Sequence, residues 1–374
     1  MDEVQARLAG RCVVVGGAVR DELMGRVPGD RDWVVVGSTP QAMREAGFQP
    51  VGRDFPVFLH PRTHEEYALA RTERKSAPGY HGFVFHAAPD VTLEQDLARR
   101  DLTINAMARG EDGVLVDPYG GARDLQAKLL RHVSPAFAED PVRLLRVARF
   151  AARWPDFSVA PETQVLLQQL VDAGEVDALV PERVWQELSR GLMEARPSRL
   201  LQVLSDCGAA ARLLPGVAPD EALLHLLDTA AELVAPLPVR YALLAPGDEA
   251  LPERLKVPTD CRELALLLGR EGAAVARGDS LSADETLALF DRSDAWRRPE
   301  RFANLLHAGT CMACAQGHSL DQPWPPAERL AAALRRAQGV DTATAARAAA
   351  AAGARGPAIG HAVGAARLQA IADT

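Results

Sequence analysis

Two aspartates at the start of an apolar segment are the first residues in this sequence whose spacing suits catalysis. Asp30 and Asp32 are separated by one residue and precede the apolar run 33–36. Because side chains alternate faces along a strand, we expect both carboxylates on one face. Two ionised carboxylates held close together repel each other. A divalent cation that prefers oxygen ligands, such as Mg²⁺, removes this unfavourable electrostatic energy. Alone, an Asp-x-Asp is more often a solvated loop or a helix cap.

A pair of glycines precedes these aspartates. Gly16 and Gly17 follow the short β-branched run 12–15 and lead into residues 18–25, whose apolar spacing is helical. Backbone N–H groups of such a turn form a site for phosphate, and Arg20 adds a guanidinium one turn into the helix. A Gly-Gly pair alone is usually plain turn chemistry. A strand, a glycine turn, a helix and a second, acidic strand in this order predict a unit that binds phosphate and metal.

This combination resembles a known family. The string GGAVRDELMG followed by DRDWVVVG is similar to the signature of class II tRNA nucleotidyltransferases, the CCA-adding enzymes, which share their core with bacterial poly(A) polymerases. The resemblance implies an α+β fold, with a polymerase-β-like head of mixed sheet and helices, then an all-α neck, body and tail. We expect the head at 1–132, the neck at 133–216, and the body and tail at 217–374.

A second motif, RRDLTINA at residues 99–106, extends the resemblance. It implies that Arg100 contacts the nucleotide triphosphate, together with Gly17 and Arg20. The family's Asp–Asn pair braces ribose or backbone, which corresponds here to Asp101 and Asn105. Their i,i+4 spacing equally favours a local hydrogen bond.

The cationic segment RTERKS, residues 71–76, admits two interpretations. It is either a solvated loop or a mobile loop near phosphate or RNA. The resemblance favours the second.

A row of polar residues at every third position crosses residues 140–149. In isolation such a row is usually a solvated arginine face. EDPVR, however, resembles the family's base-reading motif, which implies that Asp140 accepts from an exocyclic amine and Arg143 donates to base acceptors. Cytosine and adenine both carry an exocyclic amine next to a ring-nitrogen acceptor. Arg146 and Arg149 would bind triphosphate or support the pair.

The implied reaction is attack of an RNA 3′-hydroxyl on the α-phosphate of CTP or ATP, with loss of pyrophosphate. Asp30 and Asp32 would hold two Mg²⁺ ions, and the product would be the CCA end of tRNA. Poly(A) addition, CC-only addition and A-only addition remain open. So does a catalytically inactive RNA-binding protein, although the intact aspartate pair argues against it.

Composition limits the class of protein. The chain has 374 residues, enough for two or more domains, and a net charge of −8. Residues 1–153 hold 21 of the 42 basic and 21 of the 50 acidic residues, so the whole deficit lies beyond them. RNA binding therefore requires a local basic surface. The sequence has no apolar run long enough for a membrane span and no signal peptide. We expect a cytoplasmic monomer.

The C-terminal part carries two further patterns. His307, Cys311, Cys314 and His318 have a spacing that superficially suits zinc, although an ordinary alanine-rich helix explains it better. Long bacterial relatives carry a metal-dependent His-Asp phosphohydrolase domain after the neck. This sequence has no His-Asp dipeptide, and residues 236–256 stand where that metal centre is expected. We therefore expect phosphohydrolase activity to be absent. The alanine-rich residues 340–374 form either a filler helix or a tail that lies against tRNA.

Overall fold

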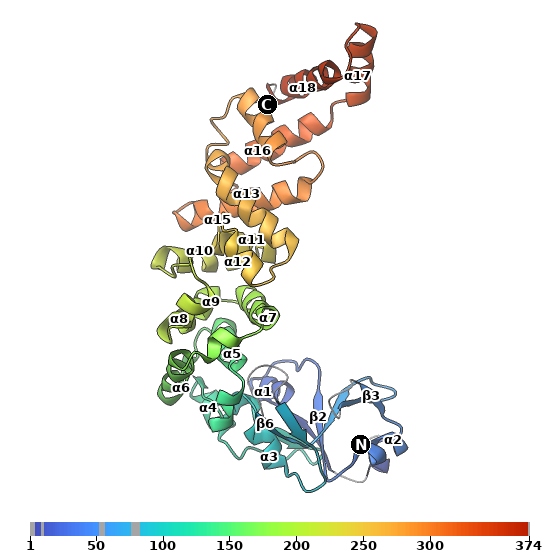
Figure 1. Cartoon of the computed structure of the whole chain (residues 1–374), viewed down its shortest axis with the longest axis vertical. Helices are drawn as coiled ribbons and strands as arrows, with labels where there is room; N and C mark the ends of the chain where they lie inside the picture. The colour runs from blue at the N-terminus through green and yellow to red at the C-terminus, as the bar shows by residue number, and fades with distance from the viewer. Residues whose placement is uncertain (1–3, 9–10, 52–56, 76–82, 373–374) are drawn as a thin grey trace. The chain divides into compact units, whose positions relative to one another are not determined.

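The computed structural model describes residues 4–8, 11–51, 57–75 and 83–372 (Figure 1). The chain forms two compact units, which are described separately below. Unit 1 comprises Met1–Glu187 and Gln202–Leu213, and unit 2 comprises Leu188–Leu201 and Leu214–Thr374. The predicted division into head, neck and body with tail stays a prediction.

A seven-stranded sheet organises unit 1, with the order β3-β4-β5-β2-β1-β8-β9. Neighbouring strands are antiparallel except β2 and β5, which run parallel, so the predicted mixed sheet is confirmed. The strands are β1 (Arg11–Val15), β2 (Asp32–Val36), β3 (Gln49–Val51), β4 (Val57–Leu59), β5 (Glu66–Leu69), β8 (Ala108–Gly110) and β9 (Leu115–Val116).

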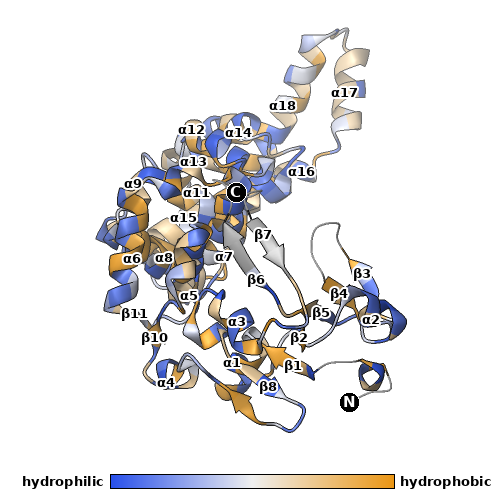
Figure 2. Ribbon diagram, turned by 60° about the horizontal axis from the view of Figure 1, so that its bottom comes forward, coloured by the Kyte–Doolittle hydropathy of each residue, from blue (hydrophilic) through white to orange (hydrophobic). Residues whose placement is uncertain are grey.

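Apolar side chains on both faces of this sheet form the core. Val13 and Val34 pack with Leu97 of α3 in one cluster, and Val35 packs with Met43 of α2 in another. Because strand neighbours point to opposite faces, Val34 and Val35 join different clusters. In Figure 2, β1 has mostly the colour of hydrophobic residues, as a central strand requires.

Short helices connect the strands, and side-chain caps mark the starts of two of them. Thr39 caps α2 through its side chain, with Pro40 in the first turn. Thr92 and Gln95 form a complete capping box at the start of α3. The bounds are α1 (Gly17–Leu23), α2 (Pro40–Glu45), α3 (Leu93–Ala98) and α4 (Gly121–Gln126), with 3₁₀ turns at Gln5–Arg7, Thr103–Asn105, Pro135–Glu139 and Glu175–Ala178.

The interpretation of residues 71–76 as a loop is wrong for the described part. Thr72–Lys75 forms β6, which pairs antiparallel with β7 (Phe83–His86) as a separate two-stranded sheet. Residues 72–75 carry little strand signal of their own, and their extended conformation depends on pairing with β7. Ser76 lies outside the described residues.

The rest of unit 1 is almost entirely helical. One detail departs from the expected all-α neck: β11 (Ser158–Val159) pairs parallel with β10 (Leu129–Leu130). Ala160 precedes Pro161, which disfavours helical backbone at that position and keeps the segment extended. The helices are α5 (Val142–Arg153), α6 (Pro161–Asp172) and α9 (Ala209–Leu213), while α7 (Pro181–Leu192) and α8 (Pro197–Asp206) cross the boundary between the units.

Described residues of unit 2 that belong to regular elements are all in helices, as predicted. Tyr241, Leu264 and Leu305 are buried on α11, α13 and α15, which pack together as its core. The helices are α10 (Glu221–Glu232), α11 (Leu237–Leu244), α12 (Ala250–Arg254), α13 (Thr259–Ala276), α14 (Ala283–Arg292), α15 (Pro299–Ala315), α16 (Pro325–Gln338), α17 (Thr342–Ala351) and α18 (Pro357–Ala372). None of the helices in the described ranges is long and apolar enough to span a membrane.

Residues 236–256 pack closely against α13 through the backbone. Gly247 has φ +77° and donates its N–H to the carbonyl of Ala265 at 2.9 Å. A Cβ placed on Gly269 would lie 2.5 Å from the Cα of Gly247, so both glycines are needed for this approach. This part of unit 2 is therefore a tight backbone contact between a turn and a helix.

Candidate functional site

The glycine turn is confirmed and lies beside an arginine of the second motif. Gly16 has φ +72°, a conformation that side chains rarely adopt, and its N–H bonds the carbonyl of Met107 at 3.0 Å. A Cβ at this position would lie 2.9 Å from Nη1 of Arg100. The absence of a side chain at Gly16 is therefore what lets the Arg100 guanidinium lie against the turn.

The two aspartates do not both lie in the strand. β2 begins at Asp32, and Asp30 lies in the bend before it, so strand alternation does not place the pair. Partial desolvation raises the pKa of Asp32, nearby Arg100 lowers it, and the charge of Asp30 raises it further. The two carboxylates are thus close enough to repel each other. Glu66 is paired with Asp32 across the parallel strands, a neighbour that only the sheet register reveals.

This donor set fits a hard divalent cation. Asp30 and Asp32 offer carboxylate oxygens, their mutual repulsion is relieved by a cation, and Mg²⁺ binds through one or two carboxylates with phosphates and water. In the part of the chain that the structure describes, no group of three or more His, Cys, Asp or Glu side chains is placed to hold a metal. The spacing of His307, Cys311, Cys314 and His318 on and after α15 therefore has no matching metal cluster there.

Most predicted site residues line one cleft of about 450 Å³ in unit 1. Asp30 and Arg149 are the two that do not line it. The cleft is lined by Gly16, Gly17, Arg20, Asp32, Arg99, Arg100, Asp101, Asn105, Asp140, Arg143, Arg146, Phe150 and Arg183. Six arginines among these residues give the cleft the cationic character that a polyphosphate requires.

Arg20 is more constrained than the sequence indicates. Only 4% of the residue is exposed, and its guanidinium donates to Asp21 and Asn105. It also lies over the ring of Trp154, 4.6 Å from the centroid. Burial lowers the pKa of Arg20, and the contact with Asp21 opposes that shift. These contacts fix the guanidinium at the wall of the cleft, and its role toward phosphate stays a prediction.

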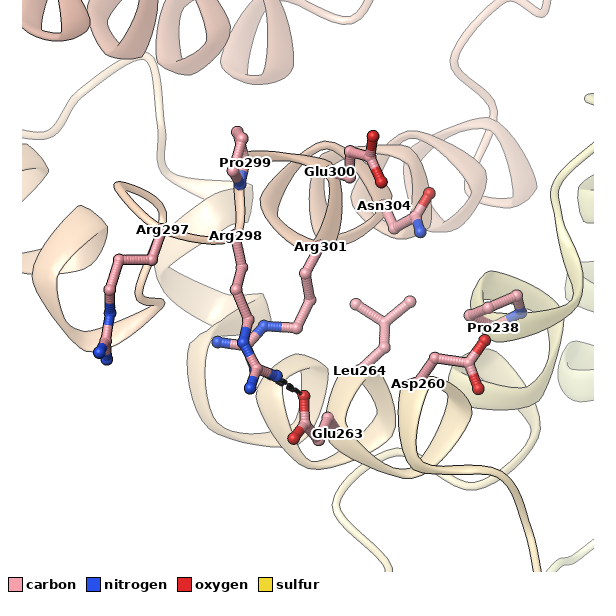
Figure 3. Close-up of a pocket in the computed structure, with 10 residues that line it drawn as sticks. All are labelled: Pro238, Asp260, Glu263, Leu264, Arg297, Arg298, Pro299, Glu300, Arg301 and Asn304. Carbon is pink, nitrogen blue, oxygen red and sulfur yellow. Dashed lines mark hydrogen bonds and ion pairs between the residues drawn. The ribbon is translucent and has the colours of Figure 1, made fainter.

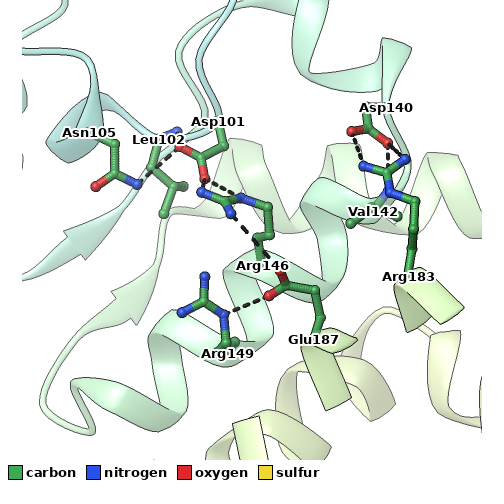
Figure 4. A network of polar contacts seen from close by, with 9 residues as sticks. All are labelled: Asp101, Leu102, Asn105, Asp140, Val142, Arg146, Arg149, Arg183 and Glu187. Atoms are coloured by element: carbon green, nitrogen blue, oxygen red, sulfur yellow. Dashed lines mark hydrogen bonds and ion pairs between the residues drawn. The ribbon is translucent and has the colours of Figure 1, made fainter. Parts of the chain in front are cut away.

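The second motif forms the local hydrogen bond that its spacing allowed. Asn105 donates to Oδ1 of Asp101 at 3.0 Å, and the N–H of Leu102 donates to the same oxygen. Arg146 of α5 donates to Oδ2 at 2.7 Å (Figure 4). Burial would raise the pKa of Asp101, but Arg146 and the hydrogen bonds lower it to about 2. Asp101 therefore links the motif to α5.

The predicted base-reading helix is held from one side by α7. The carboxylate of Asp140 accepts two hydrogen bonds from Arg183, at 3.1 and 2.8 Å (Figure 4). Its Oδ1 also accepts from the N–H of Val142, as a helix start predicts. Arg143 is 8% exposed and donates through Nη1 to the carbonyl of Ala136.

Arg149 is buried away from the cleft. Its Nε donates to Glu187 at 2.6 Å, and the same carboxylate lies 3.9 Å from Arg146. Arg183 and Glu187 were both missed from the sequence. Their i,i+4 spacing on one helix was the available signal, because it places them on one face.

A second pocket, of about 540 Å³, lies in unit 2 between the starts of α13 and α15 (Figure 3). Arg298 and Arg301 both donate to one oxygen of Glu263, and Arg297 pairs with Asp294. Its charges are thus balanced locally, and none of the predicted site residues lines it.

Known protein families and relatives match this sequence. The family description "Poly A polymerase head domain" matches residues 12–131, and "Probable RNA and SrmB- binding site of polymerase A" matches residues 156–221. A "Multifunctional CCA protein" of Leptothrix cholodnii is 57% identical, over 97% of this chain and 96% of that protein. One from Variovorax paradoxus is 53% identical, over 96% of this chain and 98% of that protein.

Solved structures share the fold. The Bacillus stearothermophilus CCA-adding enzyme in complex with CTP superposes with a TM-score of 0.71 at 22% identity, covering 97% of this chain and 88% of that one. A CCA-adding enzyme complex with ATP gives 0.70 at 20% identity, covering 96% and 86%. At this identity the likeness concerns the fold.

Proposed function

The chain belongs to the multifunctional CCA protein family, and from that premise we propose how its cleft adds CCA to the 3′ end of tRNA from CTP and ATP. The observation that carries the proposal is the gathering of the glycine turn, Asp32, Arg100 and the start of α5 around one cleft. These elements supply, respectively, a phosphate seat, a metal ligand, a phosphate counter-charge and a base-reading edge. The protein is thus a nucleotidyltransferase that needs no nucleic-acid template.

In this account the triphosphate lies along the cationic wall of the cleft. Arg100, Gly17 and Arg20 hold it, with Arg146 alongside. Asp30 and Asp32 would hold two Mg²⁺ ions, which would supply positive charge to neutralise the developing charge and to lower the pKa of the 3′-hydroxyl. The 3′-hydroxyl gives its proton to water, its oxygen forms a bond to the α-phosphorus, the bond from that phosphorus to the bridging β-phosphate oxygen breaks, and pyrophosphate leaves.

Base choice is assigned to the start of α5. Oxygens of Asp140 accept from the exocyclic amine of cytosine or adenine, and Arg143 donates to the adjacent ring acceptor. Uracil and guanine present a carbonyl toward that carboxylate, which leaves a charged acceptor unpaired. Arg149 does not line the cleft, so we assign it the support of the helix through Glu187.

The test uses tRNA transcripts that end before CCA, after C or after CC, incubated with CTP and ATP separately and together. The account predicts two cytidines, then one adenosine, and then a stop. Unlimited adenosine addition would identify a poly(A) polymerase, and addition of only CC or only A would identify a partial enzyme. A protein that binds tRNA but adds nothing would be the inactive RNA-binding alternative.

A further inference from the structure

We propose that Asp96 is a positioning residue that aims Arg100 at the nucleotide phosphates and ties it to the start of the β6–β7 hairpin. The inference deepens the proposed function and rests on it, because it concerns the same cleft. Asp96 does not line that cleft, so it acts through Arg100 rather than through contact with substrate.

Asp96 is a fully buried carboxylate shared by two arginines. The residue is 0% exposed and lies in the middle of α3. Its Oδ1 accepts from Arg99 at 2.7 and 3.1 Å, and its Oδ2 accepts from Arg100 at 3.3 Å. Burial would raise the pKa of Asp96, but the two arginines lower it overall. The carboxylate is therefore a fixed negative charge at the base of both guanidiniums.

The geometry of Arg100 leaves one side of its guanidinium for the cleft. Nη2 is held by Asp96, while Nη1 faces the glycine turn, 2.9 Å from where a Cβ of Gly16 would lie. Arg100 and Asp32 line the same cleft, so the charge of Arg100 lies beside the proposed metal ligand. A shift of the Asp96 carboxylate would move this charge relative to both the turn and Asp32.

The same carboxylate holds the backbone at the start of the hairpin. Oδ1 of Asp96 accepts from the N–H of Arg71 at 3.2 Å, and Nε of Arg99 donates to the carbonyl of Arg71 at 3.1 Å. Arg71 immediately precedes β6, and Ala70 before it donates to Val35 of β2 at 2.9 Å. Both backbone polar groups of Arg71 thus end on the Asp96–Arg99 pair, and the hairpin departs from the main sheet at this point.

These contacts couple two parts of the head. Any displacement of the hairpin at Arg71 acts on Asp96, which in turn holds Arg100 beside the phosphates. Because the triphosphate is common to all nucleotides, loss of this coupling affects their affinity equally and leaves base choice unchanged.

The test is Asp96→Asn, which keeps the shape of the side chain and removes its charge. We expect the Kd of CTP and of ATP, measured by calorimetry, to rise about tenfold, as for one lost charge-assisted hydrogen bond. The ratio of kcat/KM for CTP and ATP over that for UTP and GTP should not change, nor should KM for tRNA. Exchange of the Arg71 amide hydrogen should become faster.

Asp124→Asn is the matched control. Asp124 is also buried, 1% exposed, and accepts from Thr103 and Arg131, but it does not line the cleft. It should lower stability without changing nucleotide Kd or the exchange of Arg71. If both variants raise the Kd equally, the effect is general destabilisation and the proposal is wrong.

A double variant separates positioning from an independent effect. In the Arg100→Ala background, Asp96→Asn should add little to the loss of nucleotide affinity, and an additive loss would overturn the proposal. If Asp96→Asn does not fold, Asp96→Glu replaces it, because it keeps the charge and lengthens the side chain. Asp96→Glu should raise the nucleotide Kd by displacing Arg100. An unchanged Kd would contradict the inference. Addition of CCA by the wild-type protein is measured separately and tests the proposed function. Because nucleotide binding is measured without turnover, failure of one proposal can be told from failure of the other.

Discussion

Arg183 of α7 donates both terminal nitrogens to the two carboxylate oxygens of Asp140, the residue predicted to read the base. Oδ1 also accepts from the N–H of Val142, so the second lone pair of Oδ2 is the one left to accept from a nucleobase amine. The forked contact fixes the plane of the carboxylate, which a lysine at this position cannot do. The proposed base-reading edge is therefore a three-residue arrangement of Asp140, Arg143 and Arg183.

Removing this fork should weaken base selection. Arg183→Gln should lower kcat/KM for CTP and ATP by about 1–2 kcal/mol in transition-state stabilisation, as for a lost charged hydrogen bond. UTP and GTP should lose less, because they do not use the carboxylate. The measurement is kcat/KM for all four nucleotides. Arg190→Gln, an exposed arginine on the same helix, is the control, and an equal loss for every nucleotide would refute this role.

The donor of the pair gives a second test. Arg143→Ala removes the guanidinium proposed to donate to the base. It should cost about 1–3 kcal/mol for CTP and ATP while relaxing rejection of UTP and GTP. Contacts from Arg100 to the phosphates would remain, so general nucleotide affinity should fall less than selectivity. A uniform loss over the four nucleotides would move base reading elsewhere on α5.

Acid stability should report the Asp101–Arg146 contact. The folded-state pKa of Asp101 is about 2, below the usual 3.8, so its ionised form stabilises the fold above about pH 4. That stabilisation, roughly 2 kcal/mol, is lost as the pH falls from about 4 to about 2. Asp101→Asn should make the free energy of unfolding less dependent on pH in this window. An unchanged slope would show that the contact carries no such energy.

The sequence predicted those features that nearby residues determine. The turn at Gly16 and the helix that follows it depend on residues within a few positions, and both are confirmed. The pairing of Asp140 with Arg183 joins residues 43 positions apart, and only the packing of α5 against α7 brings them together.

Two assignments failed for a related reason. β6 and β11 are short strands whose partners, β7 and β10, decide their conformation, and their own residues carry little strand signal. The roles of Asp30, Arg20 and the other predicted site residues stay predictions, since the fold places them without testing their chemistry.

Phosphohydrolase activity should be absent. The purified protein with Ni²⁺, Mn²⁺ or Mg²⁺ should not hydrolyse 2′,3′-cyclic nucleotides, because the sequence lacks a His-Asp dipeptide and residues 236–256 form a close backbone contact with α13. A curated relative with the dipeptide serves as positive control. Metal-dependent turnover that survives Asp32→Ala would reveal a second active site.

The central claim is that Asp32 carries nucleotidyl transfer as a metal ligand. The most direct measurement is single-turnover addition of CMP to tRNA lacking CCA, comparing wild type, Asp32→Ala and the exposed-residue control Asp90→Ala. The account predicts that Asp32→Ala loses at least about a thousandfold in rate while tRNA affinity and thermal stability remain, and that Asp90→Ala matches wild type. Activity of Asp32→Ala within tenfold of wild type would contradict the account.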